Sequence, residues 1–217
     1  MSQLIFKFPF KTNYIKQDFF VSSSNFEAYK LIESWPNWPD KSINVHGPSG
    51  CGKTHLSKIL ANQMETIFIN SKNFNEETIV KNKLFKCLII DNFNNNINEK
   101  LLYSMLNHLK QIDKYVLINS LKPINHYEIK LKDLKSRLEG FIKIGISLPT
   151  DELLKVVILK IFSEKQIKIS EKNVEYIIKN IERTYDKILK FTKEIDNLSL
   201  STGKVININL IKKVLND

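Results

Sequence analysis

Gly47-Pro48-Ser49-Gly50-Cys51-Gly52-Lys53-Thr54 is the stretch that decides the fold of this chain, and it fits the pattern G-x-x-x-x-G-K-[ST]. The residues before it read SINVH and predict a short apolar strand. The residues after it, THLSKILANQ, space their apolar side chains as a helix does. A plain glycine turn with a solvated lysine would leave three closely spaced glycines without a purpose, so we interpret the stretch as a phosphate-binding loop.

This loop predicts how a nucleotide is held. Glycines allow backbone N–H groups to turn inward around phosphates. We expect Lys53 to reach the β- and γ-phosphate oxygens of ADP or ATP, and the Thr54 hydroxyl to ligate Mg²⁺. The predicted nucleotide contacts in the loop are Gly47, Ser49, Gly50, Cys51, Gly52, Lys53 and Thr54.

Five short apolar runs predict the strands of an α/β fold. Runs such as CLII and YVLI are apolar at every position, which is typical of parallel strands covered on both faces. The predicted strands are 42–46, 66–70, 86–90, 115–119 and 141–147, and the stretches 25–34, 53–63, 98–111 and 131–138 have helical spacing. After Pro149 only helical patterns follow, with a helix start at Thr150. The sequence therefore predicts a five-stranded parallel sheet sandwiched by helices, followed by a small all-α domain.

A carboxylate follows the strand LII at Asp91, where it would help to hold Mg²⁺ beside the loop. A turn residue at the end of a strand is the alternative interpretation. The next residue is Asn92, and the Asn-rich piece 92–98 is interpreted as a loop. Because an amide cannot accept a proton from water, we expect nucleotide binding with weak or no hydrolysis. Asn119 and Ser120 end the next strand and could sense the γ-phosphate, although both are also ordinary turn formers.

The charge of the chain has two open interpretations. The 217 residues carry 33 basic and 23 acidic side chains, for a net charge of +10. This excess reflects either a background preference for Lys, Ile and Asn or a weak attraction for phosphate. Arg137 and Arg183 are the only arginines, and arginine is preferred where a planar five-donor group is needed. No apolar run is long enough to span a membrane, the start has no secretory signal and only two cysteines occur, so we expect a cytoplasmic, reduced protein with no membrane partner.

Five motifs in order resemble those of the DnaA-related AAA+ family over about residues 14–217. They are FFV with Ser24-Asn25, GPSGCGKTHL, LIIDN, DLKSRLEG and TGKVININLIKKVL. The resemblance implies an AAA+ nucleotide-binding domain over 14–148 and a helical lid domain over 149–217. It also implies a homo-oligomer, and a role for Arg137 as an arginine finger offered in trans to ATP bound by DnaA. A surface ion pair with Glu139 or Asp133 is the alternative interpretation of Arg137. The four histidines lack metal-ligand spacing and are interpreted as structural.

Three features point to the Hda-like regulators within this family. The chain ends where the lid ends, so no DNA-reading helix-turn-helix domain is expected, and only residues 65–85 separate the helix after the loop from the LIID strand. Residues 1–13 include Gln3-Leu4-Ile5-Phe6-Lys7-Phe8, which resembles the peptide that docks on the DNA polymerase III β sliding clamp. Gln3, Leu4, Phe6 and Phe8 would make the contacts. A terminal strand at the sheet edge is the alternative for this peptide.

The resemblance implies a regulator that binds ADP or ATP and the DNA-loaded clamp, and stimulates hydrolysis of ATP on DnaA so that initiation is not repeated. DNA would be touched indirectly or weakly. Asp186 stands where the family places a second sensor arginine, and Arg183, one turn earlier, either substitutes for it or is an exposed helix-start residue. An acidic residue there predicts a preference for ADP. The alternatives are a DnaC-type helicase loader, another replication-associated AAA+ ATPase and a free-standing ATPase or kinase.

Overall fold

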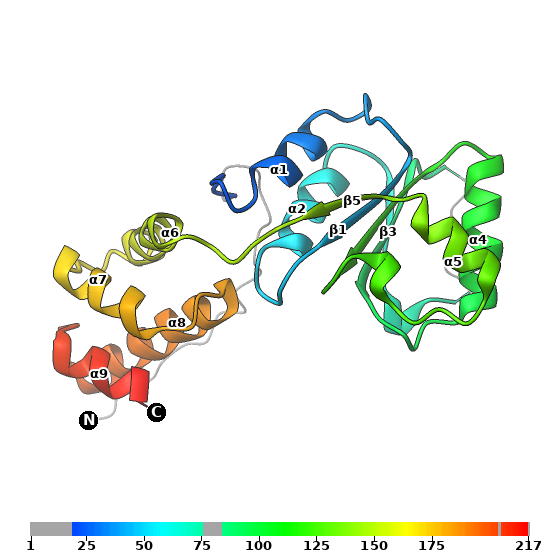
Figure 1. Cartoon of the computed structure of the whole chain (residues 1–217). Coiled ribbons are helices and arrows are strands. Elements are labelled where there is room, and N and C mark those ends of the chain that lie inside the picture. Colours follow the sequence, from blue (N-terminus) through cyan, green and yellow to red (C-terminus); the bar gives the residue numbers. More distant parts are fainter. Residues whose placement is uncertain (1–18, 76–83, 204, 217) are drawn as a thin grey trace. The chain divides into compact units, whose positions relative to one another are not determined.

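The computed structural model describes residues 19–75, 84–203 and 205–216, and these fall into two compact units. One unit extends to Ser147 and contains the sheet (Figure 1). The other begins at Leu148, and the regular secondary structure of its described residues is helical. The clamp-like peptide Gln3 to Phe8 lies outside the described residues. Within the described part of the chain, no helix combines the length and the apolar character needed to cross a lipid bilayer.

The first unit is built on a parallel sheet with the strand order β2-β3-β4-β1-β5. The strands are β1 (Ser42–His46), β2 (Thr66–Asn70), β3 (Cys87–Phe93), β4 (Tyr115–Ser120) and β5 (Ile142–Gly145). All five lie within two or three residues of the predicted positions, so the predicted fold class is confirmed. Because all strands run the same way, every loop that follows a strand reaches the same edge of the sheet.

Helices cover both faces of this sheet, as apolar strands require. Figure 1 shows α1 (Phe26–Glu33) and α2 (Lys53–Ala61) on one face, and α4 (Glu99–Gln111) and α5 (Lys132–Glu139) on the other. The apolar side chains of the two central strands β3 and β4 are divided between two hydrophobic clusters, one on each face. In β3, Cys87 and Ile89 face α1 and α2, whereas Leu88 and Ile90 face α4 and α5. Two short 3₁₀ turns, η2 (Ser71–Asn73) and η3 (Ile124–His126), follow β2 and β4.

The second unit contains the four helices α6 (Asp151–Glu164), α7 (Glu171–Asn180), α8 (Tyr185–Thr202) and α9 (Ile208–Asn216). Thr150 caps α6 by accepting a hydrogen bond from the Leu153 amide, so the predicted helix start is confirmed. Gly203 ends α8 in a left-handed conformation, which explains the predicted turn there. Asp186 lies in the first turn of α8, where a carboxylate is favoured by the helix dipole.

The sequence-based boundary of β3 is wrong at its carboxyl end. The strand continues through Asn92 to Phe93 rather than giving way to a loop at Asn92. Its register against β4 shifts between Ile90 and Phe93, and Asn92 has φ = 57° in the left-handed region. Asparagine adopts this conformation more readily than other residues with a Cβ. A break in the regular pairing, of the kind a β-bulge makes, therefore lies directly after Asp91.

A buried amide fixes the centre of the sheet. Asn44 of β1 is 0% exposed, and its Nδ2 donates to the Ile118 carbonyl at 2.9 Å and to Ser120 Oγ at 2.8 Å. Its Oδ1 accepts a hydrogen bond from the Ile124 amide at 2.9 Å. One side chain thus ties β1 to β4 and to η3, the turn that follows β4.

Replacing Asn44 with alanine should therefore destabilise the sheet. The Asn44→Ala variant leaves the Ile124 amide and the Ile118 carbonyl without this partner, and we expect the free energy of unfolding to fall by about 3 kcal/mol. Urea denaturation followed by circular dichroism measures it. Asn95→Ala, at an exposed loop position, is the matched control and should change little. Equal stability of the two variants would contradict this account of Asn44.

Candidate functional site

The phosphate-binding loop connects β1 to α2 and depends on two of its glycines. A Cβ atom at Gly47 would lie 2.1 Å from the Ile146 carbonyl oxygen, so the chain passes too close for any side chain there. Gly52 caps the start of α2 with φ = 100°, a conformation that favours glycine. Together they bring the loop tightly around the amino end of α2, where unpaired backbone N–H groups attract anions.

Lys53 is folded back onto this loop. Its Nζ donates to the carbonyl oxygens of Gly47 at 2.8 Å and Pro48 at 2.7 Å, and it lies 3.7 Å from Cys51 Sγ. The side chain is 8% exposed. A buried ammonium group needs such partners. Phosphate oxygens are stronger acceptors than neutral carbonyls, so nucleotide binding can exchange these contacts for charge-assisted ones.

Three other predicted residues of the nucleotide site meet at the carboxyl edge of the sheet. The Thr54 hydroxyl lies 3.2 and 3.0 Å from the two oxygens of Asp91, which is 5% exposed. Asn119 Nδ2 donates to Asp91 Oδ1 at 2.9 Å. Residues from α2, β3 and β4 therefore converge on one carboxylate. All three residues were predicted from their motifs, but the spacing along the chain did not reveal that they bond to one another.

Ser57 is a member of this network that sequence analysis missed. It lies one turn after Thr54 on α2 and is buried. Its hydroxyl donates to Asn119 Oδ1 at 3.1 Å and accepts from Asn119 Nδ2 at 2.8 Å. Because a carboxylate only accepts hydrogen bonds, Asp91 sets the orientation of the Asn119 amide with Nδ2 toward it, and the Ser57 hydroxyl, which can donate and accept, holds the amide in place. Ser120, the other predicted sensor, bonds instead to Asn44 and to the Lys122 carbonyl.

The donor set beside the loop fits Mg²⁺. Thr54 offers a hydroxyl oxygen and Asp91 a carboxylate, the oxygen ligands that this ion prefers when it also contacts nucleotide phosphates. Among the described residues there is no group of three or more His, Cys, Asp or Glu side chains that could hold a metal by themselves. The residues thus suit a metal bound together with a nucleotide.

Two titratable groups border the loop. Burial, with smaller contributions from the positive charges of His126 and Lys53, lowers the pKa of His46 at the end of β1. Burial raises the pKa of the Cys51 thiol against the opposing effect of Lys53. His46 is therefore held neutral and Cys51 remains a thiol near neutral pH, so neither adds a charge that would compete with phosphate.

Residues 19–25 lie against the amino end of α2. Phe19 contacts His55 edge-on, with 5.3 Å between ring centroids, and stacks on Tyr29 at 5.7 Å. Asn25 is buried and holds the segment by donating to the Phe20 carbonyl and accepting from the Ser22 amide. In the sequence this segment resembles a family motif, but nothing in its residues indicated that it lies near the site. The contact of Phe19 with His55 places it near the amino end of α2, two residues after Lys53.

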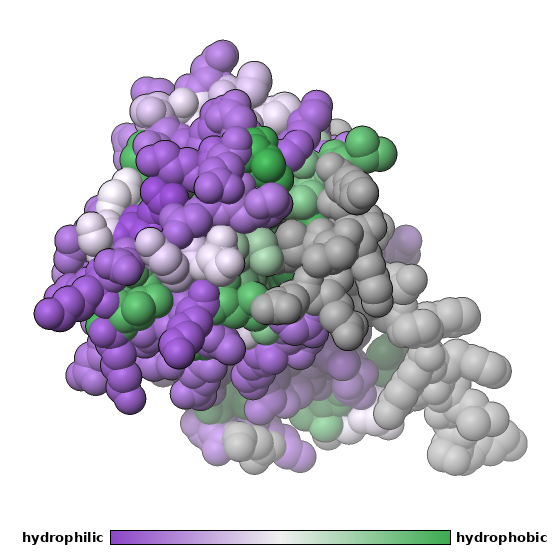
Figure 2. Space-filling view, turned by 90° about the vertical axis from the view of Figure 1, so that its right-hand side faces the viewer, coloured by the Kyte–Doolittle hydropathy of each residue, from purple (hydrophilic) through white to green (hydrophobic). Residues whose placement is uncertain are grey.

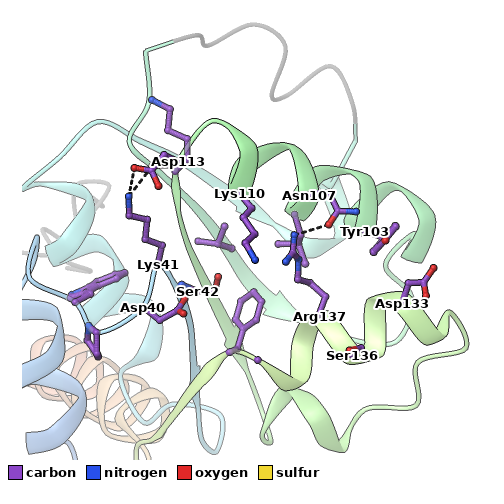
Figure 3. A pocket seen from close by; sticks show the side chains of 17 residues that line it. Asp40, Lys41, Ser42, Tyr103, Asn107, Lys110, Asp113, Asp133, Ser136 and Arg137 are labelled. Carbon is purple, nitrogen blue, oxygen red and sulfur yellow. Dashed lines mark hydrogen bonds and ion pairs between the residues drawn. The ribbon is translucent and has the colours of Figure 1, made fainter.

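Arg137 lies at the opposite edge of the sheet. Its pocket encloses about 660 Å³ and is lined by residues at the amino ends of β1 and β4, including Ser42 and Val116. The phosphate-binding loop follows the carboxyl end of β1, and a five-residue strand separates the two edges by roughly 15 Å. Figure 3 shows Arg137 extending from α5 toward α4, where its Nη2 donates to Asn107 Oδ1 at 2.7 Å.

Arg183 belongs to the helical unit. It precedes α8, and its Nη2 lies 3.0 and 3.2 Å from the two carboxylate oxygens of Asp151 at the start of α6. Both side chains are more than half exposed, so the ion pair contributes little to stability. The contact fits an exposed arginine near a helix start. Its assignment to the second sensor position stays a prediction.

Comparison with solved structures supplies the class of the fold. The chain superposes on domain III of the Thermotoga maritima replication initiation protein DnaA with a TM-score of 0.83, at 19% identity, over 97% of this chain and 98% of that one. It superposes on the Thermotoga maritima RuvB Holliday junction branch migration motor with a TM-score of 0.65, at 24% identity, over 81% of this chain and 61% of that one. The fold is that of an AAA+ P-loop domain.

Sequence comparison supplies a relative. No family model matches the chain. The chain is 26% identical over 215 residues to the chromosomal replication initiator protein DnaA of Buchnera aphidicola subsp. Cinara cedri, covering 88% of this chain and 49% of that protein. It is 24% identical over 197 residues to DnaA of Treponema denticola, covering 79% of this chain and 42% of that protein. The chain is thus homologous to the AAA+ domain of DnaA and spans about half the length of the relatives it matches.

Removing the loop lysine should abolish nucleotide binding. The Lys53→Ala variant lacks the ammonium group that would make charge-assisted hydrogen bonds to the phosphates. We therefore expect its affinity for a fluorescent ADP analogue to fall at least about a hundredfold. Titration by fluorescence anisotropy measures it. Lys132→Ala, at an exposed position of α5, is the control. Undiminished binding by Lys53→Ala would overturn the assignment of this loop.

The conformation of Asn92 gives a second prediction. An alanine there must adopt the left-handed region, so Asn92→Ala should lose about 1 kcal/mol of unfolding free energy, whereas Asn92→Gly should match the unsubstituted protein. Urea denaturation of both variants compares them. If Asn92→Gly lost as much unfolding free energy as Asn92→Ala, side-chain contacts rather than backbone conformation would explain why asparagine stands at this position.

Proposed function

We propose that this protein is a DnaA-related AAA+ regulator of the Hda type. It binds ADP or ATP with Mg²⁺ in its own P-loop and presents Arg137 to ATP held by DnaA. The guanidinium group then stabilises negative charge on the transferring phosphoryl group and accelerates its hydrolysis. The homology to DnaA supports the choice of family, and the position of Arg137 supports the direction of action.

The observation that carries this proposal is the separation of Arg137 from the chain's own loop. The two lie at opposite edges of the same sheet, with the length of β1 between them. A side chain so placed can act only on a nucleotide bound by another molecule. The guanidinium is also free of ion pairs: in the described part of the chain its hydrogen-bond partner is Asn107, and neither Asp133 nor Glu139 pairs with it.

The nucleotide of the chain itself serves a structural purpose in this proposal. A solved DnaA is bound to AMPPCP and single-stranded DNA, and the chain superposes on it with a TM-score of 0.71 at 19% identity, over 86% of this chain and 65% of that one. An adenine nucleotide suits the loop of this chain, where Thr54, Asp91 and Asn119 converge. Asn92 supplies no base for hydrolysis. The bound nucleotide therefore braces the domain and is turned over slowly.

The link to replication would come from the peptide Gln3 to Phe8. Its alternating Leu4, Phe6 and Phe8 suit an apolar cleft, and Gln3 suits a polar rim, which is the pattern expected for docking on the sliding clamp. Clamp loaded on DNA would then bring Arg137 to DnaA only after replication has begun.

The test measures hydrolysis of ATP on DnaA with clamp-loaded DNA and this protein. We expect Arg137→Ala to lower the stimulated rate by about a thousandfold, because an arginine finger contributes at least that much. Lys135→Ala, an exposed cation on the same helix and outside the pocket, should retain full activity. Normal stimulation by Arg137→Ala would refute the proposal.

Omission of each component distinguishes the rival functions. Stimulation that persists without clamp would remove the role of the Gln3–Phe8 peptide and leave that of Arg137. Capture of the replicative helicase in place of DnaA and clamp would favour a helicase loader of the DnaC type. Vigorous ATP turnover by the protein alone would favour a free-standing ATPase.

A further inference from the structure

We propose that Asn107 and Lys110 complete the Arg137 pocket as a phosphate site, in which Asn107 positions the guanidinium and Lys110 adds a second positive charge to the triphosphate of the partner. The inference rests on the proposed trans action of Arg137. It assigns roles to two residues of α4, on the wall of the pocket that faces α5 (Figure 3).

The hydrogen bond to Arg137 fixes the orientation of Asn107. A guanidinium group only donates hydrogen bonds, so the oxygen of the amide must face it, as the 2.7 Å contact between Nη2 and Oδ1 shows. The Nδ2 group then points to the other side and remains a donor. Asn107 is thus able to hold Arg137 without neutralising it, which a carboxylate at the same place would do.

Lys110 lies one turn after Asn107 and lines the same pocket. Its side chain is exposed, and among the described residues it has no ion-pair partner. Residues three apart on a helix share a face. The Lys110 ammonium, the Asn107 Nδ2 and the remaining N–H groups of Arg137 therefore offer only donors, two of them on cations, to anything that enters.

The pocket is lined by one more cation than carboxylate, with Lys41, Lys110, Lys114 and Arg137 against Asp40, Asp113 and Asp133. Asp113 is paired with Lys41, and Asp40 accepts a hydrogen bond from the Ser42 amide at 2.8 Å. Asp133, one turn before Arg137, forms no ion pair with it, and Figure 3 shows its carboxylate turned away. The part of the pocket between α4 and α5 thus favours an anion with several acceptor oxygens, as a triphosphate has.

The two walls of this site are fixed relative to each other. The carboxylate of Glu99, at the start of α4, accepts hydrogen bonds from the backbone amides of Lys130 at 3.1 Å and Leu131 at 2.7 Å, directly before α5. The face of the molecule drawn in Figure 2 is mostly hydrophilic, with small separate apolar areas. A preorganised pair of cations on such a surface suits a transient contact with charged phosphate rather than a permanent apolar interface.

The test uses the full chain with ATP-loaded DnaA and clamp-loaded DNA. We expect Asn107→Ala to lower kcat of the stimulated hydrolysis on the order of tenfold, because one hydrogen bond to a charged group is lost. Asn107→Asp should lower it further, since its carboxylate would pair with Arg137. Lys110→Ala should lower activity by a similar factor, Lys110→Arg should restore it, and Lys135→Ala should not change it.

Several outcomes separate the claims. Normal activity of Asn107→Ala and Lys110→Ala beside an inactive Arg137→Ala would overturn this inference and leave the proposed function intact. Normal activity of Arg137→Ala would remove the proposed function itself. If Lys110→Ala weakened the binding of this protein to DNA in the absence of DnaA and clamp, the site would be assigned to backbone phosphates of DNA instead. Unchanged melting temperature and ADP affinity of each variant show that the effect is local to the pocket.

Discussion

The buried carboxylate of Asp91 is the constraint on which the nucleotide site depends. A carboxylate removed from water needs hydrogen-bond donors, and the Thr54 hydroxyl and the Asn119 amide supply them from two other elements. Satisfying this one group therefore fixes α2, β3 and β4 relative to one another at the carboxyl edge of the sheet. Ser57 completes the arrangement by bonding to both polar atoms of the Asn119 side chain. The same contacts that stabilise the fold thus place the groups that would meet a metal and a γ-phosphate.

Much of this arrangement could be predicted because local sequence carries it. Continuous apolar runs gave the strands, and the glycine pattern between a strand and a helix gave the loop. The bulge at Asn92 could not be predicted, since it reflects a register shift between two strands. Nor could the bond between Arg137 and Asn107, which are 30 residues apart and meet only when α4 and α5 pack on the same face. Ser57 had no signal beyond its helical spacing from Thr54.

Arginine is rare in this chain, and Arg137, one of its two arginines, stands where a planar group with several donors suits the structure better than a lysine would. Arg137 bonds to Asn107 through one nitrogen and keeps its other donors directed into a pocket. A planar group can be held on one side and still bind on another, whereas an ammonium is a single point of charge. Lys110, in the same pocket, needs no such orientation to contribute its charge. The two cations therefore divide the tasks of geometry and charge between them.

The placement of the P-loop and Arg137 on opposite edges of one sheet also determines how copies or relatives can associate. A contact that joins one edge of a subunit to the opposite edge of the next uses two different surfaces and is head-to-tail, whereas a two-fold symmetric dimer would need both edges within one self-complementary patch. Each added subunit leaves one loop and one arginine uncovered at the two ends. Assemblies built in this way are directional, and they close into a ring or continue as a helix according to the rotation at each step.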